Sequence, residues 1–389
     1  MVQKPIYLDN HATTQCDPRV VAAMLPYFSE TFGNAASTSH RFGWEAQDAV
    51  DQAREQVAAL INTDPRNVVF TSGATEASNL AIKGLIQPLL RKSGSPPPNI
   101  ITNKAEHRAT LDPIKKMQRT DAAVTILPVD ESGRVTPEQV ADVLCDETSL
   151  VSIMLANNEI GTINPIVEIA ELCRSRNVPL HCDAVQALGR LPIDFEELGA
   201  DLVSLSAHKV YGPKGIGALI VRRGNRRARP EPLLDGGGHE NGLRSGTLPV
   251  PSIVGFGAAC QIAGDVLQVE SDNVSSLRDV LWSRLSSELD GLQVNGHPTE
   301  KLPGNLNVSF EGIDGDVLMN SLKEIAVSSG SACTSAEPEP SHVLRAIGRS
   351  DQLTRASLRF GIGRFNTPEE IDYAADYVVE TVNRLRNST

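Results

Sequence analysis

Between about residue 65 and residue 222, short apolar runs alternate with segments of helical periodicity. This alternation constrains the fold more than any other feature, because it is typical of a parallel β-sheet with helices on both faces. Residues 150–156 are almost continuously apolar, as expected for a strand covered on both faces. The pattern predicts further strands at 67–71, 99–102, 124–127, 178–182, 202–206 and 217–221, with helices at 76–90 and 166–176 between them.

The chain on either side of this region has a different pattern. It predicts a helix at 39–61, one long helix or a broken pair at 249–289, a strand at 305–310, a helix at 314–322 and a last helix from Pro368. A length of 389 residues favours more than one domain. We therefore expect a large α/β domain with a mostly parallel sheet at 15–254 and a smaller α+β domain made of 1–14 and 255–389.

Composition excludes several function classes. The formal net charge of −12 argues against a basic face for nucleic acid, and the arginines at 222, 223, 226, 227 and 229 are expected to form a solvated turn. No apolar stretch approaches the ~18 residues of a membrane span, and MVQKPIYLDN lacks the apolar core of a signal peptide. We therefore expect a cytoplasmic protein without nucleic-acid or membrane partners.

Six cysteines are scattered without a CxxC pair or a Cys/His cluster at zinc spacing, so no metal site is expected. Cys173 and Cys260 lie in apolar, helix-like segments and are expected to be buried free thiols. Cys333 differs, because residues 328–335 are small and polar and cannot pack in a core. This composition predicts a mobile surface loop at about 328–340 that carries the thiol.

Polar residues follow three of the predicted strands, at the edge where an open parallel sheet binds its ligands. They are Asn157 and Asn158 after 150–156, Asp183 and Gln186 after 178–182, and His208 and Lys209 after 202–206. Each alone has an ordinary explanation, such as a helix cap or a surface lysine. Together, a carboxylate, an amide and a lysine are what pyridoxal phosphate requires for its ring nitrogen, its phenolic oxygen and its Schiff base.

A turn of small residues at 72–76 follows the strand at 67–71 and opens a helix. Free backbone N–H groups and the positive end of the helix dipole make such a turn a phosphate site. Taken alone the signal is weak, since many helices begin in this way.

Eight segments resemble the cysteine desulfurases of the iron–sulfur and nitrogen-fixation type. They are YLDNHATT (7–14), FTSGATEASNLAIKG (70–84), AEHRATLD (105–112), NNEIGTINPI (157–166), HCDAVQALGRLPID (181–194), LSAHKVYGPKGIGAL (205–219), GGGHENGLRSGTLPV (236–250) and AVSSGSACTSAEPEPSHVLRAIG (326–348). The similarity runs in order along nearly the whole chain. It implies a class V aminotransferase of fold type I that binds pyridoxal 5'-phosphate, acts on L-cysteine and forms a homodimer.

The resemblance also implies roles for single residues. Lys209 is the Schiff-base lysine, His107 stacks on the cofactor ring and Asp183 pairs with the ring nitrogen. Gln186 and Asn158 lie on the phenolic-oxygen side, Asn158 also contacting the substrate. The phosphate is held by Ala74, Thr75, Ser206 and His208, and by Thr247 of the second subunit.

The chemistry implied by the resemblance transfers sulfur. L-cysteine displaces Lys209, which then acts as the base at Cα, while His107 acts as acid or base near the sulfur. Cys333 takes the sulfur as a persulfide, alanine leaves, and the persulfide passes to an acceptor such as an iron–sulfur scaffold protein. Of Arg355, Arg359 and Arg364, Arg359 is chosen for the substrate carboxylate by its place in the family pattern.

Two other functions remain open at this stage. A carbon–sulfur lyase or a selenocysteine lyase uses the same fold, although neither needs a thiol on a loop. A sulfur-carrier or assembly subunit without cofactor belongs to another class, and the presence of Lys209, Asp183, Gln186 and His107 argues against it.

Overall fold

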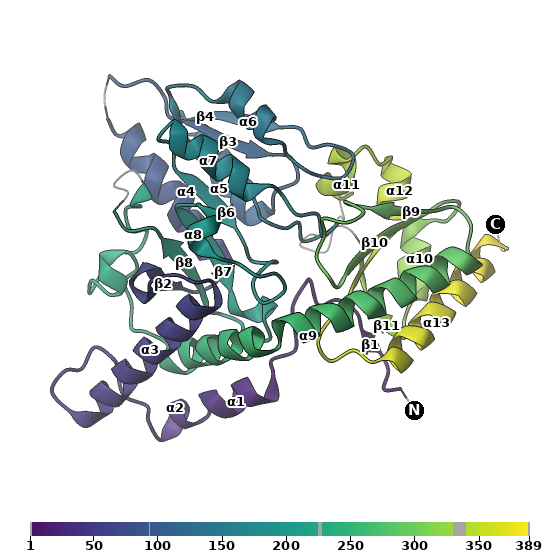
Figure 1. Cartoon of the computed structure of the whole chain (residues 1–389), viewed down its shortest axis with the longest axis horizontal. Helices are drawn as coiled ribbons and strands as arrows, with labels where there is room; N and C mark the ends of the chain where they lie inside the picture. The colour runs from purple at the N-terminus through teal and green to yellow at the C-terminus, as the bar shows by residue number, and fades with distance from the viewer. Residues whose placement is uncertain (1, 93, 225–227, 330–339, 388–389) are drawn as a thin grey trace.

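The alternating region forms a seven-stranded sheet in the computed structural model, which describes residues 2–92, 94–224, 228–329 and 340–387 (Figure 1). In spatial order the strands are β2 (Val68–Thr71), β8 (Gly217–Val221), β7 (Leu202–Ser206), β6 (Leu180–Asp183), β5 (Thr148–Ser152), β3 (Asn99–Asn103) and β4 (Ala123–Leu127). The expected α/β class is confirmed.

The sheet is mixed and not wholly parallel, because β8 runs antiparallel to both β2 and β7. A parallel neighbour would need a crossover of about a dozen residues or more, usually a helix. Residues 207–216, which join β7 to β8, hold only the short turn helix Ala207–Lys209. The sheet is therefore mostly parallel, as expected, with β8 antiparallel to its neighbours.

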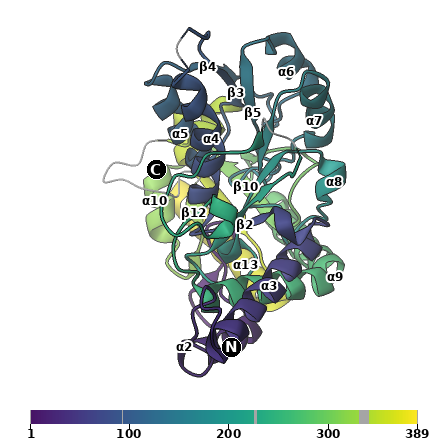
Figure 2. The same cartoon turned by 90° about the vertical axis from the view of Figure 1, so that its left-hand side faces the viewer.

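Helices cover both faces of this sheet (Figure 2). The face with Val69, Leu150 and Leu202 packs against α4 (Ala74–Leu90) and α5 (Arg108–Gln118). The following residue of each strand points to the other cluster, with α3 (Arg41–Leu60), α7 (Ile166–Ser175) and α9 (Val250–Glu288). Successive side chains of a strand point to opposite faces, and helices cover both faces. Both alternating sets of side chains in these apolar runs are therefore buried.

A second, antiparallel sheet has the order β12 (Ser328–Ser329), β13 (Ser357–Gly361), β10 (Asn305–Phe310) and β9 (Leu292–Asn295). It shares a core with α9 and with α13 (Pro368–Arg386). The N-terminal β1 (Ile6–Tyr7) pairs with β11 (Ile325–Ala326), and Asp9 bridges to Gly361. The first residues of the chain therefore lie against its last third.

The remaining helices are short. They are α1 (Pro18–Met24), α2 (Pro26–Ser29), α6 (Pro137–Val143), α8 (Phe195–Leu198), α10 (Gly315–Ser321), α11 (His342–Ala346) and α12 (Asp351–Arg355).

The long helix α9 runs without a break along both sheets (Figure 1), so the alternative of a broken pair is wrong. By length and composition alone it could cross a membrane, with a mean hydropathy of 1.4 over 18 residues. This corrects the expectation that no apolar stretch approaches that length. However, 44% of that window is buried within the fold, and the core helix of a soluble protein gives the same signal.

Helices α3 and α9 approach closely at Gly257. A Cβ added there would lie 2.6 Å from Cα of Ala53 and 2.4 Å from Oε1 of Gln56. Gly264, two turns further along α9, has room, since its added Cβ would meet only Leu60 Cδ1 at 3.6 Å. Both glycines lie in α9, but a side chain would clash with α3 at Gly257 and not at Gly264.

We expect Gly257→Ala to destabilise the protein by ~1–3 kcal/mol, because the added methyl overpacks the α3–α9 contact. Gly264→Ala is the matched control and should stabilise by up to ~1 kcal/mol, since alanine is the better helix former. Denaturant unfolding of both variants at one protein concentration measures the difference. Equal midpoints would contradict the packing argument.

Candidate active site

Ladder registers bring the ends of the central strands together. Gly217 of β8 pairs with Thr71 of β2 on one side and with Ser206 of β7 on the other. Asp183, the last residue of β6, pairs with Ser204 of β7. The residues that follow β2, β6 and β7 therefore share one edge of the sheet, where open α/β sheets bind ligands.

Lys209 ends the turn helix that directly follows β7. Its Nζ donates hydrogen bonds to the main-chain carbonyl oxygens of His11 (2.5 Å) and Ala12 (2.6 Å). The N-terminal segment thus holds the amine of Lys209 at the strand ends through two uncharged acceptors.

Asp183 and His107 lie close enough to Lys209 for their charges to interact. Burial raises the pKa of Asp183, which is only 6% exposed, and the charges of His107 and Lys209 oppose that rise. Its Oδ1 accepts a hydrogen bond from the backbone N–H of Val185 (3.1 Å). Burial lowers the pKa of His107, whose ring caps α5 by accepting from Ala109 N–H (3.1 Å). A neutral imidazole thus lies beside a buried carboxyl group.

Gln186 and Asn158 supply the amides that the sequence predicted. Gln186 is 4% exposed, and its Nε2 donates to the main-chain oxygen of His11 at 2.9 Å. Its Oε1 accepts from Nη1 of Arg190 at 3.0 Å. The Oδ1 of Asn158 is buried and has no hydrogen-bond partner among the described residues.

The predicted phosphate turn also lies at this edge. Helix α4 begins at Ala74 after Gly73, which has φ +143° and provides no side-chain cap for the first amides. A Cβ added at Gly217 would lie 2.8 Å from Cα of Gly73, so the glycine lets the turn approach Ser206. The backbone N–H groups of Ala74 and Thr75 are therefore available to an anion.

Two further predicted phosphate ligands have different surroundings. The ring of His208 lies 3.1 Å from Oγ1 of Thr13, and burial and the charge of Lys209 lower its pKa to about 4. Thr247 is exposed on the segment that leads into α9. That segment is anchored near the first turn of α4 by an ion pair between Arg244 and Glu76 (3.0 Å).

The three candidate arginines occupy different environments. Arg359 of β13 is 2% exposed and donates to Asp9 Oδ1 (2.7 Å) and to the main-chain oxygen of Asn158 (2.8 Å). Arg364 binds Glu270 (2.6 Å) and Asp17 (3.1 Å), away from these groups. Arg355 is exposed at the end of α12. Arg359 therefore contacts another predicted site residue, Asn158.

Cys333 lies outside the described residues, but both flanking segments can be placed. Ser328 and Ser329 of β12 pair with β13, where Ser328 is the partner of Arg359. On the other side, Ser341 Oγ donates to Glu159 Oε2, and His342 Nε2 lies 2.9 Å from the main-chain oxygen of Glu106. The segment before Cys333 therefore pairs with the strand of Arg359. The segment after it contacts Glu159 and Glu106, which are the sequence neighbours of Asn158 and His107.

Several polar residues at this edge were not singled out from the sequence. Burial raises the pKa of Glu106 to about 8 and that of Glu159 to about 7. Asp9, His11 and Arg190 contact Arg359, Lys209 and Gln186. Asp9 and His11 belong to the segment YLDNHATT, and their partners are distant in the sequence. Their position in that motif was the one available signal.

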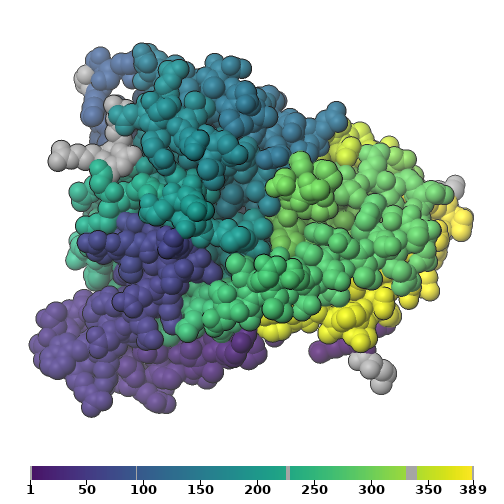
Figure 3. Space-filling model, viewed as in Figure 1, coloured from purple at the N-terminus to yellow at the C-terminus, as the bar shows by residue number. Residues whose placement is uncertain are grey.

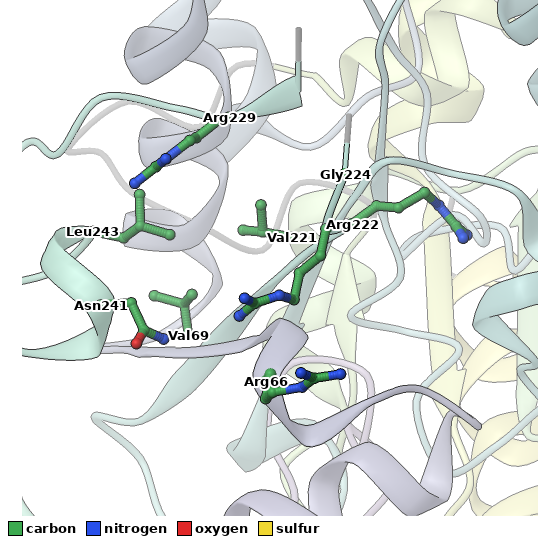
Figure 4. A pocket seen from close by; sticks show the side chains of 9 residues that line it. Arg66, Val69, Val221, Arg222, Gly224, Arg229, Asn241 and Leu243 are labelled. Carbon is green, nitrogen blue, oxygen red and sulfur yellow. The ribbon is translucent and has the colours of Figure 1, made fainter. Parts of the chain in front are cut away.

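A separate pocket of about 350 Å³ lies at the opposite end of the β2–β8 pair (Figure 4). Val69, Val221 and several arginines line it. Arg66 is paired with Asp64 and Arg222 with Glu196 (2.6 Å), while Arg223 is exposed. The exposure of Arg223 agrees with the expected solvated turn, Arg222 is partly buried, and Arg226 and Arg227 lie outside the described residues. None of the predicted site residues lines the pocket.

The residues at the strand ends fit pyridoxal phosphate. The buried carboxylate of Asp183 suits a protonated ring nitrogen, and the unpartnered Oδ1 of Asn158 and Nε of Arg359 suit polar ligand atoms. The uncapped start of α4 suits a phosphate. Among the described residues, no group of three or more His, Cys, Asp or Glu side chains could bind a metal ion.

Comparison with known proteins agrees with this site. The family model for aminotransferase class V matches residues 6–374. The chain is 52% identical to the cysteine desulfurase IscS of Anaeromyxobacter sp. (strain Fw109-5), covering 98% of this chain and 93% of that protein. It is 53% identical to the cysteine desulfurase IscS of Pseudomonas putida (strain W619), covering 98% and 94%.

Solved structures show the same likeness. A NifS-like protein superposes with a TM-score of 0.90 at 36% identity, covering 98% of this chain and all of that one. SspA in complex with cysteine superposes with a TM-score of 0.82 at 34% identity, covering 94% of this chain and all of that one. The chain therefore belongs to the class-V aminotransferase family, and within it to the cysteine desulfurases that depend on pyridoxal phosphate.

Proposed function

We propose that this desulfurase holds its cofactor and substrate with the residues gathered at the carboxyl edge of the large sheet. Lys209 anchors the cofactor, Asp183 pairs with its ring nitrogen, His107 stacks on the ring, and Gln186 and Asn158 lie on the phenolic-oxygen side. The phosphate is held by Ala74, Thr75, Ser206 and His208, and by Thr247 of a second subunit.

One observation carries this assignment. The carboxyl group of Asp183 is buried, and its hydrogen bond from Val185 N–H comes from an uncharged group. A buried carboxylate is costly without a positive partner, and a protonated pyridine nitrogen supplies one. Lys209 and His107 lie near enough for their charges to lower the pKa of Asp183.

Bound pyridoxal phosphate supplies an electron sink for the bonds at the substrate Cα. Lys209, held by the carbonyl oxygens of His11 and Ala12, is placed to take the Cα proton. Nδ1 of His107 accepts from Ala109 N–H, so the neutral ring carries its hydrogen on Nε2 and can donate that proton near the substrate sulfur.

Arg359 binds the carboxylate of L-cysteine in this proposal. Its guanidinium group is buried and already oriented by Asp9 and by the main chain of Asn158. Its Nη1 and Nη2 each donate one of these hydrogen bonds, which leaves one further N–H on each for the carboxylate oxygens. Planar guanidinium groups suit two-pronged carboxylate binding.

We further propose that Cys333 accepts the sulfur as a persulfide. Its residue range is flanked by Ser329, next to the strand of Arg359, and by Ser341, which contacts Glu159. The positions of these two flanking residues support the proposal.

An exposed apolar surface supports a homodimer. It consists of Val21, Leu25, Phe28, Phe32, Phe42 and Trp44, each between 41% and 62% exposed. These residues lie on α1, α2, the following loop and the start of α3, the purple end of the molecule in Figures 1 and 3. Apolar patches of this kind usually mark protein interfaces. A second copy seated there would supply the Thr247 of the proposed phosphate site.

We propose that the enzyme works in the cytoplasm and passes its persulfide to an acceptor of iron–sulfur cluster assembly. The relatives named IscS support that pathway. Cys173, Cys182 and Cys260 are free and buried, and burial raises the pKa of each thiol. Unpaired thiols suit a reducing compartment.

We also propose the division into a large domain at 15–254 and a small domain of 1–14 with 255–389. The pairing of β1 with β11 and the bridge from Asp9 to Gly361 support assigning the first residues to the small domain. Helix α9 crosses the boundary, which makes the two domains share one long element.

Lys209→Ala should lower the rate of alanine formation from L-cysteine at least about a hundredfold, because the variant loses both the covalent anchor and the base. It should also lose the visible absorption band of the lysine-bound cofactor. Lys116→Ala, on the exposed side of α5, is the control and should behave as wild type. Normal turnover in Lys209→Ala would refute the assignment.

Cys333→Ser should still bind cofactor and L-cysteine but lose sulfur transfer, because a hydroxyl group cannot carry a persulfide. Mass spectrometry of the peptide after cysteine treatment should find one extra sulfur on Cys333 in wild type and none in the variant. The exposed thiol of Cys145 provides the control, and Cys145→Ser should retain transfer. Release of pyruvate and sulfide by Cys333→Ser at the wild-type rate would favour the lyase.

Phe28→Asp combined with Phe32→Asp should convert the dimer into monomers, because two charges cannot be buried unpaired in an interface. The Kd for pyridoxal phosphate should rise, since Thr247 of the second subunit is lost. Light scattering and equilibrium dialysis measure the two effects. Val269→Asp on α9, where Val269 is 67% exposed outside this surface, is the control. Monomers with wild-type cofactor affinity would refute the shared site.

A further inference from the structure

His11 is a buried imidazole inside the site to which no role has been given so far. It is 1% exposed, and its main-chain oxygen accepts from Lys209 Nζ (2.5 Å) and Gln186 Nε2 (2.9 Å). Its ring Nδ1 lies 3.1 Å from Gln186 Oε1. One residue therefore contacts both the lysine and the amide of the proposed cofactor site.

The hydrogen bonds of Gln186 determine the tautomer of His11. A main-chain oxygen can only accept, so the amide nitrogen of Gln186 must face the His11 carbonyl and its Oε1 must face the ring. Arg190 Nη1 donates to the same Oε1 at 3.0 Å, which holds the amide in this orientation. Because Oε1 is also only an acceptor, Nδ1 of His11 must carry the hydrogen.

The other ring nitrogen is then an acceptor without a partner. Burial, followed by the charges of Arg190 and Arg359, lowers the pKa of His11, so the ring stays neutral and Nε2 keeps its lone pair. Nε2 is buried and has no hydrogen-bond partner among the described residues. Buried acceptors of this kind are rare unless a water or ligand completes them.

The ring lies next to Arg359. A Cβ added at Gly361 would lie 3.0 Å from Cδ2 of His11, so the ring fills the space where a side chain at 361 would project. Residues 359 and 361 are two apart in β13 and face the same side of the strand. The Nε of Arg359 is a buried donor that also lacks a partner in the described structure.

We propose that His11 is a positioning residue that connects Gln186 to Arg359. Its Nδ1–H holds the Gln186 amide, leaving the second amide N–H for the phenolic oxygen of the cofactor. Its Nε2 accepts from Arg359 Nε through one bridging water, and so orients the guanidinium group for the substrate carboxylate. This inference rests on the roles proposed above for Gln186 and Arg359.

The two contacts of His11 can be separated by substitution. In His11→Asn the side-chain nitrogen takes the place of Nδ1 and keeps the donor to Gln186, but the acceptor toward Arg359 is lost. In His11→Gln the amide oxygen takes the place of Nε2 and keeps that acceptor, but the donor to Gln186 is lost. His11→Phe keeps the ring volume and loses both contacts.

The readout is binding of L-alanine to the holoenzyme, followed through the visible absorption band of the cofactor. L-alanine has the α-carboxylate but no sulfur, so Cys333 chemistry does not enter. His11→Asn and His11→Phe should raise the Kd for L-alanine about fivefold to tenfold, as for the loss of a typical hydrogen bond. His11→Gln should stay within about twofold of wild type.

The second readout is the position of the cofactor band without any amino acid. It should shift in His11→Gln and His11→Phe, where the Gln186 amide is less firmly held, and stay unchanged in His11→Asn. The thermal unfolding temperature of each variant measures general destabilisation. Destabilisation alone would not make His11→Asn affect only L-alanine binding and His11→Gln affect only the cofactor band.

Arg359→Lys distinguishes failure of this inference from failure of the proposed function. If Arg359→Lys weakens L-alanine while all three His11 variants bind it as wild type does, His11 does not orient Arg359 and the inference is overturned alone. If Arg359→Lys also leaves L-alanine binding unchanged, the substrate role of Arg359 is wrong and the inference falls with it.

Discussion

The registers of the hydrogen-bond ladders in the large sheet determine where the residues that follow β2, β6 and β7 lie. Pairing of Gly217 with both Thr71 and Ser206, and of Asp183 with Ser204, aligns three strand ends at one edge. A shift of one residue in any ladder would turn the side chains of that strand to the opposite face. The close approach of Gly73 to Gly217 then brings the proposed phosphate turn close to the start of β8.

Burial decides the charges at this edge. Burial raises the pKa of Asp183, and it raises that of Glu106 to about 8, while it lowers the pKa values of His107 and His11. Glu106 is therefore mostly protonated at neutral pH and adds little negative charge beside Asp183. Because these groups are buried, where the effective dielectric constant is low, a charged group of a bound ligand interacts with them more strongly than it would in water.

The substrate side of the site depends on contacts between distant parts of the chain. Arg359 comes from the second sheet, Asp9 from the N-terminal segment and Asn158 from the loop after β5. The same N-terminal segment holds Lys209 and Gln186 through His11. A few residues at the start of the chain therefore contact both the proposed cofactor residues and the proposed substrate arginine.

By itself, the sequence determined the α/β class, most central strands and helices, and the strand-end residues Asp183, Gln186 and Lys209, because apolar periodicity and local position are properties of neighbouring residues. The family motifs identified the cofactor and the reaction. Only the tertiary structure decided that β8 is antiparallel, that Arg359 is the arginine beside Asn158, and that Asp9 and His11 join the site. These features depend on contacts between residues up to several hundred positions apart, and no local pattern encodes such contacts.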